Sequence, residues 1–426
     1  MIPQISFCIS TARNERYHLE LLFRSLNKNL SRKDHEILVF IENDNQGTTE
    51  WIVTQRQLFP NLKIIKNPLP VPIGYQRNVN IMFEMAKYPI TSYIQSDMVV
   101  GPKYDEEIIK YLTPDSILSS TRIEPPLHPP SFEKITYDFG LDPKTFDLDT
   151  FSTFAETQKK TEMTDFWFSP FTLYKKNWND IGGHDTLFRR AREDSDLLYR
   201  FTMKGLNIKQ IWNAVVYHFT CVSSRGPEWW TEKSQKRTQL QQMADRIEMT
   251  KFMRKWPKFK HTTTFDPLKE YKHPVSVNFK NVSPHNAEAI LQNYYLFDKI
   301  YIDNPIIRAK LKIAFGEFQK PANILFEMTA PQWNQYKKYY HVWEFEDIFV
   351  NSPLTEEDVI LDVDPQSMDV FTNPIVLQIN DIIHQSDPGR YECGTGVLII
   401  NRVVNKIQDN IVVQNPPLDD VDFIFL

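Results

Sequence analysis

Three polar residues, Thr11, Glu42 and Asp97, each stand just past a short, apolar, β-prone run of the sequence. These runs are Ile5–Ser10, Glu36–Ile41 and Ile90–Ile94. In open, mostly parallel sheets, ligands bind beyond the carboxyl ends of the strands, so we expect the three side chains to converge on one crevice. The plainer alternative is that turns after strands require polar residues. For each residue taken singly, that alternative stays open.

The elements that would position these residues alternate between strand and helix. Apolar residues at helical spacing predict helices at His18–Leu30, Thr49–Phe59 and Gly74–Lys87. A further strand is predicted at Leu62–Lys66. Later strands are predicted at Trp167–Tyr174, Ile208–Ile211 and Ala214–Tyr217, with a helix opening at 192–196 and Gly205 as its C-cap. The paired glycines Gly182 and Gly183 permit a tight turn or close approach by another group. This alternation is typical of a mostly parallel sheet covered by helices.

With 426 residues, the chain is long enough for two domains. Strand-like stretches recur after residue 262, at Pro274–Phe279, Lys299–Ile302, Ala322–Phe326 and Val359–Val363, with helical stretches at His285–Phe297 and Pro305–Phe318. We predict an α/β fold with a first domain at 1–261, including a basic helical connection at 229–261, and a smaller second α/β domain of unknown role at 262–426. Asp362-Val363-Asp364 looks like a metal-binding acidic pair, but we favour the interpretation as a turn after a strand.

Charge and cysteine content narrow the function classes. The net charge of −5 argues against a general nucleic-acid binder, although the basic stretch Lys233–Lys260 would suit a phosphate-rich partner or an anionic membrane if it is more than a solvated helix face. Three distant cysteines, Cys8, Cys221 and Cys393, favour a reducing compartment. No signal-like start and no apolar run of membrane-spanning length is found in the sequence, so we expect a cytoplasmic protein without a transmembrane segment, for which peripheral membrane contact stays open.

Taken in order, several motifs resemble the family 2 glycosyltransferases and their relatives with the GT-A fold. The matching segments are Ile9–Glu15, Glu42–Asp44, Gly74–Asn78, Gln95–Met98, Ile181–Asp185, Glu193–Arg200 and Val216–His218. Each segment alone is a weak signal, and the resemblance covers about the first half of the chain. It implies a GT-A type, mostly parallel mixed sheet flanked by helices, which binds a nucleoside-diphosphate sugar.

The resemblance also implies a divalent cation, Mn or Mg, bridging the donor's phosphates, because a cation stabilises negative charge on the leaving diphosphate. Asp97 takes the second acidic position of the family's Asp-x-Asp motif and is the expected metal ligand, with His218 completing the coordination. Gln95 replaces the first Asp, so a neutral amide would make that contact, with Ser96 between them. A structural hydrogen-bonding role is the alternative for His218.

The remaining donor contacts follow from the same resemblance. The base and ribose would lie against Thr11 and Glu42, with Asp44 as a neighbour. Arg77 resembles a basic residue that approaches the base or the diphosphate; the alternative is a solvated helix charge.

Inversion at the anomeric carbon requires a carboxylate that takes the acceptor's proton. In the family's Glu-Asp motif this is Asp194, with Glu193 positioning donor or acceptor; acidic residues at a helix start also stabilise the helix dipole without any catalytic role. We therefore expect a metal-assisted, inverting glycosyltransferase of hexosyltransferase type, with a glycan, lipid-linked or other hydroxyl acceptor. A non-catalytic sugar- or protein-binding relative and a sugar nucleotidyltransferase remain alternatives. Donor sugar, acceptor and oligomeric state are not determined by the sequence.

Overall fold

A computed structural model describes most of the chain. The described residues are 2–69, 72–189, 191–220, 239–256, 275–325, 331, 343–357, 359–363, 379, 382–383, 387–393, 396–401, 411–417 and 421–426. Cys221 and Asp364 lie outside the described residues, as do residues 233–238 and 257–260 of the basic stretch.

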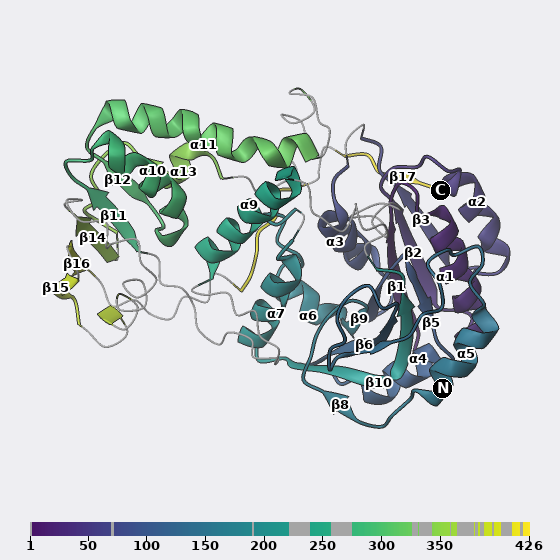
Figure 1. Ribbon diagram of the computed structural model, residues 1–426. Coiled ribbons are helices and arrows are strands. Elements are labelled where there is room, and N and C mark those ends of the chain that lie inside the picture. The colour runs from purple at the N-terminus through teal and green to yellow at the C-terminus, as the bar shows by residue number, and fades with distance from the viewer. Residues whose placement is uncertain are drawn as a thin grey trace.

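The helices and strands follow one another in the order shown in Figure 1. The first part contains β1 (Ile5–Thr11), α1 (Arg16–Asn29), β2 (Glu36–Ile41), α2 (Thr48–Thr54), η1 (Gln55–Gln57), β3 (Leu62–Lys66), α3 (Tyr75–Met85), β4 (Ile90–Gln95), β5 (Met98–Val100), α4 (Tyr104–Tyr111), β6 (Ser116–Glu124), β7 (Lys134–Thr136), α5 (Leu148–Thr157), β8 (Met163–Thr164), β9 (Phe171–Tyr174), α6 (Lys175–Asn179), α7 (Glu193–Met203) and β10 (Asn207–His218). The second part contains α9 (Gln239–Lys255), β11 (Ser276–Phe279), α10 (Pro284–Asn293), η3 (Tyr294–Leu296), β12 (Ile300–Ile302), α11 (Pro305–Leu325), α13 (Phe345–Ile348), β13 (Phe349–Val350), β14 (Val359–Val363), β15 (Gly389–Cys393), β16 (Gly396–Ile400) and β17 (Ile424–Phe425).

The first sheet is the predicted mostly parallel, mixed sheet. Its main path runs β17-β3-β2-β1-β4-β9-β6-β10-β5, with β7 and β8 at its margin. The pairs β1–β2, β2–β3, β1–β4 and β6–β10 are parallel, whereas β9 runs antiparallel between β4 and β6. We call this sheet and its helices, residues 5–218, the first unit.

Helices cover both faces of this sheet, which explains why its strands read as continuous apolar runs. Side chains of α1 and α4 join Phe7 and Val39 in one buried cluster, while α3 and α7 join Cys8 and Phe40 in a cluster on the opposite face. The alternation of neighbouring strand residues between the two clusters is the two-residue period of a strand.

A second sheet, ordered β13-β12-β11-β14-β16-β15, is built from residues after 275. Strands β11 to β14 pair in parallel, and β16 pairs antiparallel with both β14 and β15. Its own buried cluster includes Val277, Phe315 and Phe349. We call residues 275–401 the second unit. The predicted α/β class, with a second smaller α/β part, is thereby confirmed, and Figure 1 shows the two sheets on opposite sides of the molecule.

The chain's last described segments return to the first unit. Strand β17 pairs antiparallel with β3, and the backbone N–H of Val413 donates to the carbonyl of Ile181 at 3.1 Å. The division at residue 262 stays a prediction, but it would place these segments with the second domain although they contact the first sheet.

Three expectations about elements change. Ala322–Phe326 was expected as a strand, but residues 322–325 continue helix α11; a short apolar run does not distinguish strand from helix. Ile208–Ile211 and Ala214–Tyr217 form one strand, β10, whose pairing with β6 shifts between Ile211 and Val215. The strand expected at Trp167–Tyr174 is confined to Phe171–Tyr174.

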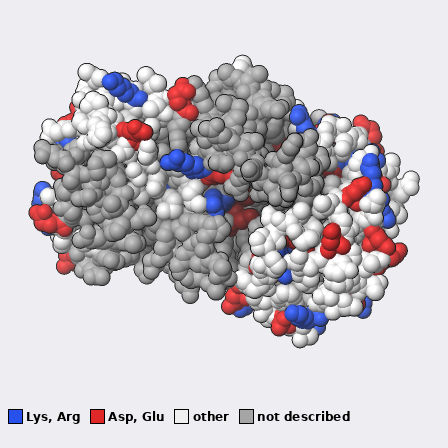
Figure 2. Space-filling model, viewed as in Figure 1, with Lys and Arg blue, Asp and Glu red and all other residues white. Residues whose placement is uncertain are grey.

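In the described part of the chain, no helix combines the length and the apolar character needed to cross a membrane. On the face shown in Figure 2, acidic and basic side chains are interspersed over the described surface and do not gather into a patch of one sign.

Candidate active site

Asp97 and His218, the two expected metal ligands, lie beside each other. His218 ends β10 and Asp97 follows β4, and the pairing of β10 with β5 brings them together. The distance between His218 Nε2 and Asp97 Oδ2 is 3.8 Å, and both residues are buried. His218 Nε2 and Asp97 Oδ2, both able to bind a metal ion, are therefore close together at the carboxyl edge of the sheet.

Glu124, which ends β6, fixes the orientation of His218. Its Oε1 lies 2.9 Å from His218 Nδ1, so Nε2 is left to face Asp97. Metal-binding histidines are commonly held in this way, with one ring nitrogen bonded to a carboxylate and the other on the metal. Carboxylate oxygen and imidazole nitrogen also suit Mn²⁺, so the residues present fit a divalent cation.

Two cations keep Glu124 ionised. Arg122 Nη1 and Lys134 Nζ each lie 3.0 Å from its carboxylate. Burial acts to raise the pKa of Glu124, but the hydrogen bond to His218 and the charges of these cations hold it well below its usual range. Glu124 therefore presents a permanent negative charge to His218.

Glu193 and Asp194 open helix α7, as predicted. The Tyr75 hydroxyl donates to Glu193 Oε1 at 2.6 Å. Burial and the neighbouring charge of Asp194 raise the pKa of Glu193 to about 8. Burial also raises the pKa of Asp194, to about 6, against the opposing effect of Arg122. Asp194, half-buried, is thus ionised at neutral pH but basic enough to accept a proton.

The metal-side and base-side carboxylates share one neighbourhood. Burial raises the pKa of Tyr93, and the charges of Asp97, Glu15, Asp194 and Glu193 raise it further. Tyr93 thus lies within electrostatic reach of both Asp97 and Asp194, which are 97 residues apart in sequence. Arg122 also lies between the two sides, since it is paired with Glu124, which is bonded to His218, and its charge acts on Asp194.

Thr11 and Glu42 adjoin each other, as expected from the pairing of β1 with β2. The Glu42 backbone N–H donates to the Thr11 carbonyl at 2.9 Å. The Glu42 carboxylate, however, accepts bonds from Asn78 Nδ2 at 2.6 Å, from the backbone N–H of Gly74 at 3.2 Å and from that of Ile73. Burial raises the pKa of Glu42 to about 7 against these bonds. Its present contacts organise the start of α3, and no nucleoside contact is needed to explain them.

Asp44 has an equally complete structural role. Its carboxylate accepts from the backbone N–H groups of Gln46, Thr48 and Thr49 at 2.8–3.0 Å, at the start of α2. Although burial acts to raise it, these bonds hold the pKa of Asp44 well below its usual range.

Arg77 is buried in α3, contrary to the solvated alternative.

Some of the buried polar atoms without hydrogen-bond partners lie where the sugar donor was expected. In the described part of the chain, Thr11 Oγ1, Gln76 Oε1 and Nε2, Asn78 Oδ1, Gln95 Oε1 and Glu193 Oε2 are buried and lack a hydrogen-bond partner. Thr11, Gln76, Asn78 and Gln95 belong to β1, α3 and β4, which are neighbours, and Tyr75 of α3 links Glu193 to them. Buried polar groups are normally satisfied, so these atoms have hydrogen-bonding capacity that a polar ligand could use.

Several residues of the site were not predicted from the sequence. Glu124 and Arg122 belong to β6, a strand that was not predicted, and Tyr75 was noted only within its motif. Glu15 Oε2 accepts from Ser96 Oγ at 2.6 Å and from the Ala12 backbone N–H at 2.8 Å, which ties the end of β4 to the turn after β1. The sequence offered little signal for Glu124, because the stretch before it mixes apolar residues with Ser, Thr and Arg.

Within the described residues, no group of three or more His, Cys, Asp or Glu side chains is arranged to hold a metal ion. A metal ion at this edge would therefore meet two side-chain ligands, Asp97 and His218, because Glu124 is engaged with the far side of the ring.

The fold and this edge define a class: an α/β unit with a carboxylate- and histidine-bearing site at the carboxyl ends of its strands. No family model matches the chain, and no curated protein matches it. Among solved structures, the chain is similar to GalNAc-T7 with UDP, GalNAc and Mn²⁺ (16% identity, 51% of this chain and 44% of that one, TM-score 0.40). It is also similar to S. aureus TarS (11% identity, 76% of this chain and 54% of that one, TM-score 0.41). A third similar structure is the mannosyltransferase PcManGT from Pyrobaculum calidifontis with GDP-Man and Mn²⁺ (14% identity, 79% of this chain and 79% of that one, TM-score 0.41). The chain spans about half the length of the first two. Likeness at this level assigns neither an activity nor a substrate.

Proposed function

We propose that the first unit is an inverting glycosyltransferase that moves a hexose-like sugar from a nucleoside diphosphate to an acceptor hydroxyl. The observation that carries this proposal is the pairing of Asp97 with a carboxylate-held His218 in the same neighbourhood as Asp194. The surrounding unpartnered polar atoms of Thr11, Gln76 and Gln95 support a polar ligand there.

Asp97 and His218 would hold Mn²⁺ or Mg²⁺, and the donor's phosphate oxygens would complete its coordination. A cation bound there stabilises the negative charge that builds on the diphosphate as the glycosidic bond breaks.

Asp194 would act as the general base. The acceptor oxygen forms a bond to the anomeric carbon, the bond from that carbon to the diphosphate oxygen breaks, and the acceptor's proton passes to the Asp194 carboxylate. Glu193, held by Tyr75 and with a raised pKa, remains largely protonated at neutral pH and would orient donor or acceptor by hydrogen bonding.

The test begins with a screen of nucleotide sugars for metal-dependent hydrolysis, because slow hydrolysis identifies the donor without knowledge of the acceptor. Asp97→Asn should remove most of the metal-dependent rate. The control is Asp115→Asn. Asp115 is exposed and directly precedes β6, at the end of that strand away from Glu124. Equal loss in both variants would contradict the assignment of Asp97.

The second arm separates base from donor binding. Asp194→Asn should reduce turnover by about two to four orders of magnitude, the usual range for a general base, while calorimetry shows unchanged donor affinity. Retained turnover would reject Asp194 as the base. Absence of any metal-dependent nucleotide-sugar binding would favour a non-catalytic binding protein, and pyrophosphate release from a sugar phosphate and a nucleoside triphosphate would favour a nucleotidyltransferase.

A further inference from the structure

The second unit repeats the strand arrangement at the heart of the first. In the first unit, β1, β2 and β3 pair in parallel in sequence order, β4 pairs on the other side of β1, and antiparallel β9 follows. In the second unit, β11, β12, β13, β14 and antiparallel β16 have the same order and directions.

The correspondence extends to the residues at the strand ends. Glu42 and Asn67 directly follow β2 and β3, and Asp303 and Asn351 directly follow β12 and β13. Because such sheets bind ligands beyond the carboxyl ends of their strands, the second unit has its own edge at which a ligand is expected.

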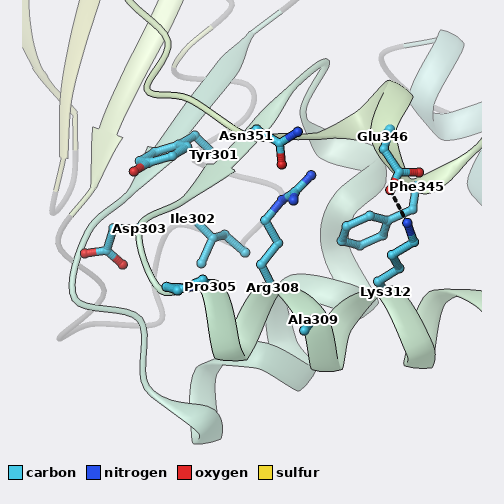
Figure 3. A pocket seen from close by; sticks show the side chains of 10 residues that line it. All are labelled: Tyr301, Ile302, Asp303, Pro305, Arg308, Ala309, Lys312, Phe345, Glu346 and Asn351. Carbon is cyan, nitrogen blue, oxygen red and sulfur yellow. Dashed lines mark hydrogen bonds and ion pairs between the residues drawn. The ribbon is translucent and has the colours of Figure 1, made fainter.

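A cavity of about 390 Å³ lies at that edge. Figure 3 shows it between the ends of β12 and β13 and the first turns of α11, with Tyr301, Asp303, Arg308 and Asn351 among its lining residues. This volume lies within the range of small-molecule sites.

Arg308 brings a cation into this cavity, where its charge contributes to the lowered pKa of Glu346 but forms no ion pair with it. Its Nη2 donates to the Phe349 carbonyl at 2.5 Å, and its buried Nε has no hydrogen-bond partner in the described part of the chain. Among the same residues Arg308 forms no ion pair, whereas Lys312, one turn further along α11, is paired with Glu346. Figure 3 shows the Arg308 side chain rising from α11 between Asn351 and Phe345. A half-buried guanidinium of this kind is suited to a phosphate.

The helix itself does not supply the anion contact. Asn304 Oδ1 accepts from the backbone N–H groups of Ile306 at 3.0 Å and Ile307 at 3.2 Å, so the start of α11 is already capped. An anion in this cavity would therefore be met by the Arg308 side chain.

Other lining residues of the cavity offer groups for hydroxyls and a base. Asp303 is exposed and uses Oδ2 to accept from the Asn281 backbone N–H at 2.7 Å, which leaves Oδ1 for ligand hydroxyls. An acidic side chain at the end of a strand binds the paired hydroxyls of a ribose in other α/β nucleotide sites. The Asn351 amide can both donate and accept, and the Tyr301 ring offers an aromatic wall.

We propose that the second unit binds a nucleoside phosphate of its own in this cavity, separate from the donor site of the first unit. Its phosphate contacts Arg308 and its ribose contacts Asp303. This is a binding site, and no chemical step is assigned to it.

The test measures binding to the full chain carrying Asp97→Asn, in EDTA, so that the first unit's metal-dependent site does not contribute. UDP, GDP, ADP, CDP and inorganic phosphate are titrated by calorimetry. We expect one equivalent of at least one nucleotide to bind, and more tightly than phosphate. Failure of every nucleotide to bind, or binding of phosphate as tight as that of every nucleotide, would overturn the proposal.

Variants of the lining residues then locate the bound nucleotide. Arg308→Met, which keeps the aliphatic stem, should weaken binding at least tenfold, and Asp303→Asn should weaken nucleotide binding but not phosphate binding. Lys310→Met is the control, since Lys310 is exposed on the same helix outside the cavity. Unchanged affinity in both Arg308→Met and Asp303→Asn would place the nucleotide elsewhere. Wild-type hydrolysis with metal is a separate measurement, so failure of the first site is distinguishable from failure of this one.

Discussion

At the residue scale, the site is defined more by the partners of the predicted residues than by those residues themselves. The resemblance to known motifs singled out Asp97, His218 and Asp194, but each is a common residue type at a strand or helix end. Glu124 and Arg122 determine how these residues can act. Glu124 orients His218, and the charge of Arg122 lowers the pKa of Asp194. These contacts join β6 to β10 and α7 across about 70 to 95 residues, and residue spacing carries no information about such pairings.

The first prediction concerns the pH dependence of donor hydrolysis. Asp194 must be deprotonated to act as a base, so kcat/KM should rise with pH through about 6, its raised pKa. The positive charge of Arg122 favours the ionised carboxylate and thereby lowers this pKa. Arg122→Met should therefore move the acidic limb to higher pH, by up to about one pH unit. The measurement is the pH profile of kcat/KM between pH 5 and 8.

Lys134→Met is the matched control for Arg122. Both cations lie 3.0 Å from the same Glu124 carboxylate, but only Arg122 acts on Asp194. The acidic limb of Lys134→Met should stay in place. An equal shift in both variants would mean that Glu124, and not Asp194, governs the limb.

At the element scale, the strands and helices with the strongest patterns were predicted closely. β2 and β3 coincide with their predicted ranges, because buried parallel strands are continuous apolar runs between turns. β6 was missed because Ser-Ser-Thr interrupts its apolar pattern, although all nine residues are buried; Thr121 Oγ1, for example, donates to the Ile211 carbonyl at 3.0 Å. Local pattern thus fails where neighbouring strands satisfy polar side chains.

The second prediction concerns the packing of α9 on α7. Asp196, fully buried in α7, accepts from Arg200 Nε at 2.7 Å and from Trp256 Nε1 at 3.0 Å, and its carboxylate lies 2.7 Å from Lys255 Nζ. Asp196→Ala would leave two buried cations without this carboxylate. We expect it to lower the free energy of unfolding by about 3–5 kcal/mol, the usual cost of breaking a buried ion pair.

Urea unfolding followed by circular dichroism measures this change. Ser195→Ala, at the neighbouring half-buried position of the same helix turn, should change stability by less than about 0.5 kcal/mol. A small effect of Asp196→Ala would show that α9 is held to α7 mainly by the apolar contacts of Phe252 and Trp256.

At the scale of the whole molecule, the sequence indicated two α/β parts but not how the chain's end joins them. Residues 411–417 and 421–426 contain short apolar runs, Ile411–Val413 and Phe423–Leu426, but such short runs do not indicate which sheet they join, so nothing local predicted their return to the first unit. The predicted close approach at the paired glycines is explained by this return at Gly182, whereas the side chains of Asn80 and Trp178 approach Gly183. Both have positive φ angles, 73° and 72°, and the Val413 backbone packs directly on Gly182.

The last prediction tests whether this returning segment supports the site. Asn415 Nδ2 donates to the carbonyls of Gly182 at 3.1 Å and His184 at 2.8 Å, and its Oδ1 accepts from the Thr186 backbone N–H at 2.9 Å. These bonds hold the turn that leads to α7 and therefore to Asp194. Asn415→Ala should lower the melting temperature by several degrees, since three hydrogen bonds of about 1 kcal/mol each are lost. It should also reduce kcat more than donor affinity, because the displaced group is the base and not the metal ligands. Gln414→Ala, an exposed neighbour in the same segment, serves as the control and should change neither quantity. If Asn415→Ala lowers stability while kcat at a temperature well below the transition stays at the wild-type value, the segment acts only as a structural support and does not position Asp194.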